Sequence, residues 1–305
     1  MPDRLPELST LWTLGLVMAA TLAVLLLTLL WANLRLLLRP PRMDDARALR
    51  RLGRLTPNDV GLNWESMDFV VRGLKLPGWW MPHEGSTKTA VLVHGWAGGK
   101  VDVIAWAPLW HALGWNVLAY DQRAHGDADG TLCTHGHEER HDLAAVLGEL
   151  RSQRPEQSRE VALFGVSMGT AIIAAYAAEH NDVDHVVLES PYTSFPDAAY
   201  HHGDHFGFPL PGSAPLVMDV AQWRTGADFS ELAPLNTIPK ITVPLLVMHS
   251  TRDPYTPADD AAKLRSAVDA VGGTWADFDA LHVAGFAEEP ERYGDVLANF
   301  LTAKR

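Results

Sequence analysis

The sequence predicts an α/β fold: a mostly parallel sheet covered by helices on both faces, preceded by one N-terminal transmembrane helix. Short, continuously apolar runs alternate with helical segments, as in buried parallel strands joined by helical connections. Residues 161–180 place a serine between such a strand and an alanine-rich helix. Near the N-terminus, residues 8–34 contain no charged side chain.

Length and composition limit the possible functions. A chain of 305 residues that is 47% hydrophobic can bury one large core. The formal net charge of −12 argues against a nucleic-acid polymer as partner. The single cysteine, Cys133, excludes an intramolecular disulfide and a zinc site built from several thiolates, and it suits a reducing compartment.

The apolar segment predicts a membrane anchor. Residues 11–32 are long enough to cross a hydrocarbon core of ~30 Å as a helix, and Trp12 and Trp31 lie near its two ends. A cleaved signal peptide would need a shorter apolar region, a cationic leader and a small-residue cleavage site. A buried core helix would show a polar face. We expect an anchor with its basic flank over residues 1–42, a linker over 43–63, and a globular domain over 64–305.

Flanking charge predicts the orientation. Arg4 precedes the span, whereas seven arginines follow it: Arg35, Arg39, Arg42, Arg47, Arg50, Arg51 and Arg54. The positive-inside rule therefore places the large C-terminal part in the cytoplasm. Because the candidate catalytic residues described below lie beyond residue 90, we expect a chain without residues 1–42 to be soluble and active.

The order of elements can be read from apolar runs. We expect strands at residues 90–93, 116–120, 161–164, 186–190, 243–249 and 274–280, and helices at 107–113, 138–150 and 171–178. Residues 64–82 indicate two antiparallel strands around Arg72 and Gly73 that enter the sheet from one edge. Residues 196–239 contain no long periodic element and predict a lid.

A candidate nucleophile lies in the sequence Gly165-Val166-Ser167-Met168-Gly169. A G-x-S-x-G between a strand and a helix forces a sharp turn that lifts the serine hydroxyl clear of the sheet. The two glycines let strand and helix approach closely, and the helix N-terminus favours developing negative charge. This setting predicts a nucleophilic serine at position 167.

Two further residues complete a possible catalytic chain. Asp253 follows a buried strand at its C-terminal end, and His282 follows the next strand. Serine needs a neutral imidazole to accept its proton, and a carboxylate to orient the imidazole. The backbone N–H of Met168 and that of Trp96, after His94-Gly95, are the expected oxyanion donors.

Together, LVHGWAGG, YDQRAHGD, FGVSMGT, HSTRDPYTP and LHVAGFAEEPERY resemble the α/β-hydrolase superfamily. The nearest likeness is to membrane-anchored serine hydrolases with a serine-aminopeptidase-like or lysophospholipase-like core. The resemblance implies a Ser167–Asp253–His282 triad, and it implies that His94 supports its loop without a catalytic role. One departure is Leu281, where the family commonly has a glycine before the histidine.

Other residues allow alternative interpretations. Glu189 also ends a strand and is the second candidate for the acid, while Asp277 and Asp279 are expected to face solvent. Arg123 and His125 are expected to brace their loop. Loop histidines without a metal motif are expected to be solvated rather than metal ligands; they are His135, His137, His141, His201, His202 and His205, with Asp204 nearby.

We therefore expect a serine hydrolase that cleaves a carboxylic ester, thioester or amide, with no cofactor and no metal. A peptidase of the serine-aminopeptidase type and a non-catalytic binding protein on the same fold are the alternatives. The anchor favours a lipid-like ester, as do four apolar residues of the expected lid: Phe206, Phe208, Leu210 and Leu216.

Overall fold

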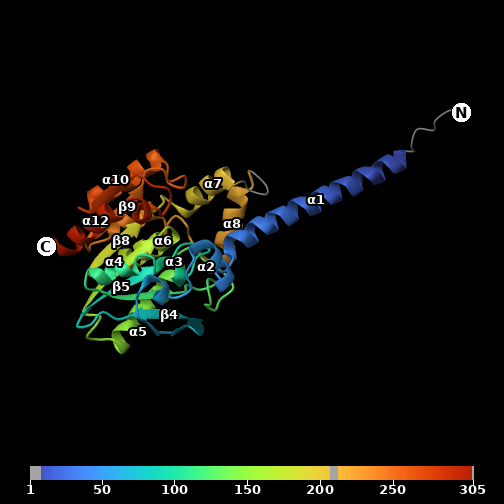
Figure 1. The fold of residues 1–305 in the computed structure, drawn as a ribbon. Coiled ribbons are helices and arrows are strands. Elements are labelled where there is room, and N and C mark those ends of the chain that lie inside the picture. Colours follow the sequence, from blue (N-terminus) through green and yellow to red (C-terminus); the bar gives the residue numbers. More distant parts are fainter. Residues whose placement is uncertain (1–7, 207–211, 304–305) are drawn as a thin grey trace.

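An eight-stranded sheet forms the centre of the molecule, in the strand order β1-β4-β6-β5-β7-β8-β9-β10. The computed structural model describes residues 8–206 and 212–303. All neighbouring pairs from β6 to β10 are parallel, while β4 and β1 add antiparallel strands at one edge. Helices cover both faces of the sheet, and α1 (Leu8–Leu38) projects away from the domain (Figure 1). The predicted mostly parallel α/β architecture is confirmed.

The strands of the main sheet are β1 (Glu65–Ser66), β4 (Gly78–Met81), β5 (Lys88–Val93), β6 (Asn116–Tyr120), β7 (Glu160–Val166), β8 (His185–Glu189), β9 (Leu245–Ser250) and β10 (Thr274–Phe278). The central strands are apolar throughout because both of their faces are covered. In β5, Val91 and Val93 belong to the core on one face, while Ala90 and Leu92 belong to the core on the other.

The predicted hairpin around Arg72 and Gly73 exists, but its predicted place in the sheet is wrong. β2 (Phe69–Val71) and β3 (Leu74–Leu76) pair only with each other, across a turn in which Arg72 and Gly73 both have positive φ. Pro77 follows β3 at once and has no N–H to continue a ladder. The edge of the main sheet is instead formed by β4 and β1.

Two sets of helices cover the two faces. On one face lie α5 (Glu139–Gln153), α6 (Met168–Glu179) and α10 (Ala258–Ala270), and on the other lie α2 (Asp45–Leu52), α3 (Lys100–Val103), α4 (Ala107–Ala112) and α12 (Pro290–Thr302). The expected linker contains α2 and the 3₁₀ turn η1 (Pro57–Val60). Asp44 caps the start of α2 through the Arg47 N–H, and Gly53 ends it in a left-handed conformation.

The segment expected to lack regular elements contains two helices, α7 (Phe195–Phe206) and α8 (Ala214–Thr225), followed by α9 (Pro234–Thr237) and η2 (Ile238–Lys240). α8 packs against α1, and its buried Met218 and Ala221 join the cluster that contains Leu38. Tertiary packing therefore stabilises helices whose own sequence shows little periodicity. Phe208 and Leu210 lie outside the described residues, as do the side chains of Asp204, His205 and Phe206.

Helix α1 is long and apolar enough to cross a membrane over Thr10–Leu38, which fits either an anchor or a signal sequence. Its side chains are exposed from residue 10 to residue 28, and its last turns pack on the domain. At 1.5 Å per residue the exposed part measures about 28 Å, close to the thickness of a hydrocarbon core. Leu38, the last residue of α1, is buried.

Candidate active site

Ser167 occupies a strained turn between β7 and α6. Its φ and ψ are 52° and −120°, a combination that L-residues rarely adopt. Two close approaches hold this turn and require glycine on either side. A Cβ on Gly165 would lie 2.6 Å from the Gly169 carbonyl oxygen, and a Cβ on Gly169 would lie 2.3 Å from the Val93 oxygen. The turn therefore depends on the absence of these side chains.

The structure brings the three predicted side chains together. His282 Nε2 lies 2.9 Å from Ser167 Oγ, and His282 Nδ1 lies 2.5 Å from Asp253 Oδ2. The Asp253 side chain is fully buried, and its other oxygen accepts the Tyr255 N–H at 2.8 Å. An acceptor at Nδ1 fixes the tautomer that leaves Nε2 free to take the serine proton.

The loop that carries His282 is fixed from two sides. Val283, which follows the histidine, has a positive φ of 59° and donates its N–H to Ser190 Oγ at 3.0 Å. The Tyr255 ring meets the His282 ring edge-on at 4.6 Å. Leu281 is 55% exposed, so its side chain projects outward at the position where the resemblance implies a glycine. The departure from the family pattern is therefore accommodated.

Two backbone N–H groups are available near Ser167. Met168 is the first residue of α6, and Trp96 lies in the loop after β5. Within the described part of the chain, neither N–H donates a turn or loop hydrogen bond. A Cβ on Gly95 would lie 3.2 Å from Ser167 Cβ, which shows how closely this loop passes the serine. The arrangement suits two donors aimed at one oxyanion.

His94 holds the loop that carries Trp96. Its Nδ1–H donates to the Gly95 carbonyl at 2.8 Å, and its Nε2 accepts the Gln122 N–H at 3.0 Å. Burial lowers the pKa of His94 well below its usual value, so the ring is neutral. His94 does not line the cavity that contains Ser167.

The alternative acids lie elsewhere. The Tyr293 hydroxyl donates to Glu189 Oε2 at 2.9 Å, and burial raises the pKa of Glu189 to about 8. The Glu189 carbonyl also accepts the Ser167 N–H at 3.0 Å, which makes Glu189 a backbone support for the serine turn. Asp277 and Asp279 are bound to arginines, Arg265 and Arg252 respectively.

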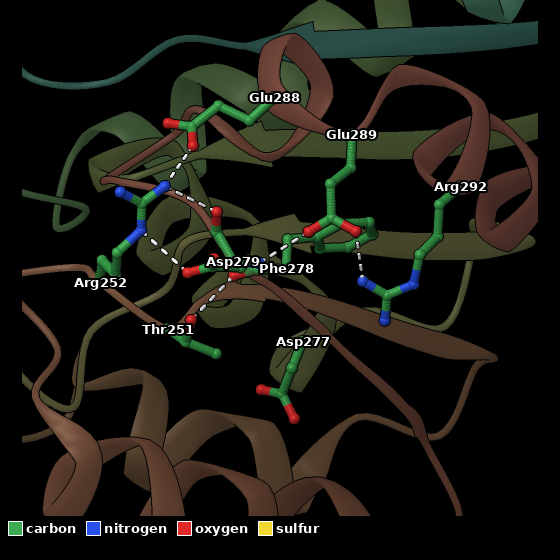
Figure 2. Close-up of a pocket in the computed structure, with 8 residues that line it drawn as sticks. All are labelled: Thr251, Arg252, Asp277, Phe278, Asp279, Glu288, Glu289 and Arg292. Carbon is green, nitrogen blue, oxygen red and sulfur yellow. Dashed lines mark hydrogen bonds and ion pairs between the residues drawn. The ribbon is translucent and has the colours of Figure 1, made fainter.

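Those two aspartates line a separate open cavity of about 530 Å³, here called the Arg252 cavity. Figure 2 shows that its charged side chains face one another: Arg252 pairs with Asp279 and Glu288, and Arg292 pairs with Glu289. Ser167, His282 and Asp253 are absent from its lining. Because each of its charged side chains is paired with an oppositely charged one, we assign no chemistry to the Arg252 cavity.

Ser167 and His282 open into another cavity, of about 410 Å³, here called the Ser167 cavity. Helix α7 forms one wall through Phe195, Ala198, Ala199 and His202. Another wall comes from the end of α1 and from α2: Asn33, Leu36, Leu37, Arg47 and Arg51. The sequence analysis missed this wall. A polar Asn33 in an apolar run and arginines spaced by four residues were the available signals.

The remaining candidate residues have structural partners. Arg123 makes a bidentate pair with Asp142, and His125 Nδ1 donates to the Arg123 carbonyl. His135 Nε2 bonds the Leu37 carbonyl, and its ring stacks on Phe195. His201 pairs with Asp260, His202 stacks on Tyr255, and the rings of His137 and His141 are 6.5 Å apart. Among the described residues no group of three potential metal ligands occurs.

Two features together define an α/β-hydrolase fold. One is the strand order, and the other is the placement of the serine after β7, the aspartate after β9 and the histidine after β10. A family model described as alpha/beta hydrolase fold matches residues 89–214. The chain therefore has the α/β-hydrolase fold.

Three known proteins are similar to this chain. The esterase Pf2001 of Pyrococcus furiosus is 25% identical with a TM-score of 0.70, over 86% of this chain and 98% of that chain. The uncharacterized protein YqkD of Bacillus subtilis (strain 168) is 26% identical over 257 residues, 81% of this chain and 82% of YqkD. The lysophosphatidylserine lipase ABHD12 of Macaca fascicularis is 24% identical over 169 residues, 51% of this chain and 38% of the lipase. These matches support hydrolase activity.

Proposed function

We propose that this protein is a membrane-anchored serine hydrolase that cleaves a carboxylic ester through an acyl-enzyme on Ser167. The observation that carries the proposal is the hydrogen-bonded chain Ser167–His282–Asp253, with distances of 2.9 Å and 2.5 Å, at the wall of the Ser167 cavity. A buried carboxylate, a correctly oriented imidazole and a strained serine turn are the parts that acyl transfer needs.

In the first half-reaction, Ser167 Oγ attacks the carbonyl carbon of the ester while His282 Nε2 takes the hydroxyl proton. The N–H groups of Met168 and Trp96 stabilise the oxyanion of the tetrahedral intermediate. The bond to the alcohol oxygen then breaks, and the imidazolium gives that oxygen its proton. Water repeats the sequence on the acyl-enzyme and releases the acid. Thioesters and amides can follow the same route with different leaving groups.

A lipid-like ester is the substrate class that we favour. The Ser167 cavity is lined on its α1 and α7 sides by apolar side chains, including Leu36, Leu37 and Phe195. The Pyrococcus furiosus relative is named an esterase, and the primate relative is named a lysophosphatidylserine lipase. An enzyme tethered at the bilayer would meet such esters where they are concentrated.

The test is hydrolysis by the full-length protein of p-nitrophenyl esters of increasing chain length, beside aminoacyl and peptidyl anilides. Ester cleavage that Ser167→Ala lowers by several orders of magnitude supports the proposal. Faster cleavage of anilides would favour a peptidase instead. Absence of any turnover in a folded protein would favour a non-catalytic binding protein.

We further propose that α1 is a single-pass anchor and that the catalytic domain faces the cytoplasm. Seven arginines follow the span and one precedes it, and carrying an arginine through the hydrocarbon costs several kcal/mol. Reporter fusions at Arg305 test the orientation. A fused reporter that functions only in the cytoplasm should give a signal. A signal from a fused reporter that functions only after export would contradict the proposal.

A further inference from the structure

The end of the anchor is part of the Ser167 cavity. Asn33, Leu36 and Leu37 of α1 line the same cavity as Ser167 and His282. Helix α2, which follows α1, lies beside its base in Figure 1 and lines the cavity too. The exposed stretch of α1 ends at residue 28, one turn before Asn33. The cavity therefore lies directly under the expected membrane surface.

This wall is firmly attached to the domain. The Leu37 carbonyl accepts the indole N–H of Trp96 at 3.4 Å and is 3.1 Å from His135 Nε2. The Leu38 carbonyl accepts the Cys133 N–H at 2.8 Å, and the Leu38 side chain is buried. The last turn of α1 is thus tied to the loop that carries the proposed oxyanion donor Trp96.

The α2 side of the wall is cationic. Arg47 and Arg51 are four residues apart on one helix, so they share a face. Neither takes part in an ion pair within the described part of the chain. The guanidinium of Arg47 donates to the Pro41 carbonyl at 3.1 Å and more weakly to the Arg42 carbonyl at 3.5 Å.

The acidic side chain of Asp102 acts on both arginines without forming an ion pair with either of them. Asp102 interacts with both arginines electrostatically, but its Oδ2 accepts the Gly99 N–H at 2.8 Å. Burial raises the pKa of Asp102 although the arginines oppose this shift. Two cations thus line a largely apolar cavity without a carboxylate bound to them. An anion in the cavity would provide the missing partner.

The cavity also contains polar atoms without partners. Asn33 Oδ1, His135 Nδ1 and Tyr192 Oη are buried, and none has a hydrogen-bond partner among the described residues. All three residues line the Ser167 cavity. Buried polar atoms are usually satisfied, so these three atoms call for partners, which polar groups of a ligand or water molecules can supply. The cavity thus combines an apolar wall, a cationic edge and free polar atoms.

We propose that the ends of α1 and α2 form a substrate subsite for an amphiphilic ester that carries an anionic group. The apolar chain packs against Leu36 and Leu37, and the anionic oxygens bind Arg47 and Arg51. This proposal rests on the proposed esterase function and names its substrate class. The anion can be a phosphate or a carboxylate, because both accept paired guanidinium hydrogen bonds.

The experiment compares three esters that share the same acyl chain and differ in the alcohol. The alcohol is glycerol in the neutral ester, and glycerol phosphate or a hydroxy acid in the two anionic esters. The full-length protein in nanodiscs is assayed as wild type, as Arg47→Gln/Arg51→Gln and as the control Arg50→Gln. Arg50 lies on the same helix, is exposed and does not line the cavity. The measured quantity is the ratio of kcat/KM for each anionic ester to kcat/KM for the neutral ester.

Wild type should prefer at least one anionic ester, and the double variant should lower that preference by about tenfold or more. Arg50→Gln should keep the wild-type ratio. Preference for the phosphate or for the carboxylate identifies the anion. No preference in wild type, or an equal loss on neutral and anionic esters, would overturn the subsite. Absence of turnover of all three esters by a folded wild type would instead overturn the proposed function.

A second pair of variants tests the apolar wall. Leu36→Trp places a larger side chain on the cavity wall, whereas Leu27→Trp makes the same change on the exposed part of α1. Leu36→Trp should lower kcat/KM for long-chain esters by about tenfold while short-chain esters are spared. Equal effects of both variants, or equal effects on all chain lengths, would refute a role of α1 in chain binding.

Discussion

Removal of residues 1–42 should cost both stability and activity, contrary to what the sequence alone indicates. The deletion removes the Leu37 and Leu38 carbonyls, which accept the Trp96 indole N–H and the Cys133 backbone N–H. It also removes Arg42, whose guanidinium donates to carbonyls between residues 125 and 130. Finally it removes the buried Leu38 side chain.

The size of the effect follows from these contacts. Burial of a leucine side chain contributes about 2 kcal/mol, and each neutral hydrogen bond contributes about 1 kcal/mol. Arg42 is exposed, so its hydrogen bonds contribute less to the free energy of unfolding than those of a buried charged side chain would. The deletion should therefore lower the free energy of unfolding by about 4 kcal/mol and Tm by about 10 °C. It also opens one wall of the Ser167 cavity.

A shorter deletion is the control. A chain that begins near residue 28 loses the exposed part of α1 but keeps the half-buried and buried residues of its last turns. Calorimetry and hydrolysis of a soluble short-chain ester should show near wild-type values for this protein. The 1–42 deletion should show a lower Tm and at least about tenfold lower activity. Wild-type Tm and activity after the 1–42 deletion would refute the assignment of α1 to the cavity wall.

Three further predictions concern single residues. Asp253→Asn should lower kcat by roughly 10⁴ without unfolding the protein, while Glu189→Gln has a far smaller effect; steady-state kinetics with the reverse order would identify Glu189 as the acid. Gly169→Ala should lower the free energy of unfolding by about 2–3 kcal/mol, because the added Cβ would lie 2.3 Å from the Val93 oxygen. An unchanged Tm would contradict this prediction. Glu189 keeps its proton up to about pH 8 in the folded protein, whereas the unfolded side chain releases it near pH 4.5. The free energy of unfolding should therefore fall by as much as ~4 kcal/mol as the pH rises from 4.5 to 8. Urea denaturation at pH 5 and pH 8 should show this fall reduced in Glu189→Gln; equal falls would contradict it.

The positions of Ser167, Asp253 and His282 could be predicted because each follows a strand, which is buried and mostly apolar before Ser167 and Asp253 and alternates before His282. Parallel strands present their C-terminal ends at one edge, so residues far apart in sequence were expected to meet there. The structure brings the three side chains within hydrogen-bonding distance. Their catalytic roles stay predictions.

The wall formed by α1 and α2 could not be predicted in the same way. α1 is apolar on every side, so its sequence does not indicate the turn at which the helix leaves lipid and meets protein. The helices α7 and α8 were missed because they depend on packing against α1 and the domain rather than on local periodicity. The β2–β3 hairpin was recognised from its turn, but Pro77 separates it from the main sheet.

The most direct test of the central claim is covalent labelling of Ser167. The full-length protein is treated with a fluorophosphonate probe, which reacts with activated serines, and the modified peptide is identified by mass spectrometry. Labelling should occur on Ser167, should disappear in Ser167→Ala and should be strongly slowed in His282→Ala. Undiminished labelling of Ser167→Ala, or a modified peptide that lacks residue 167, would contradict the account.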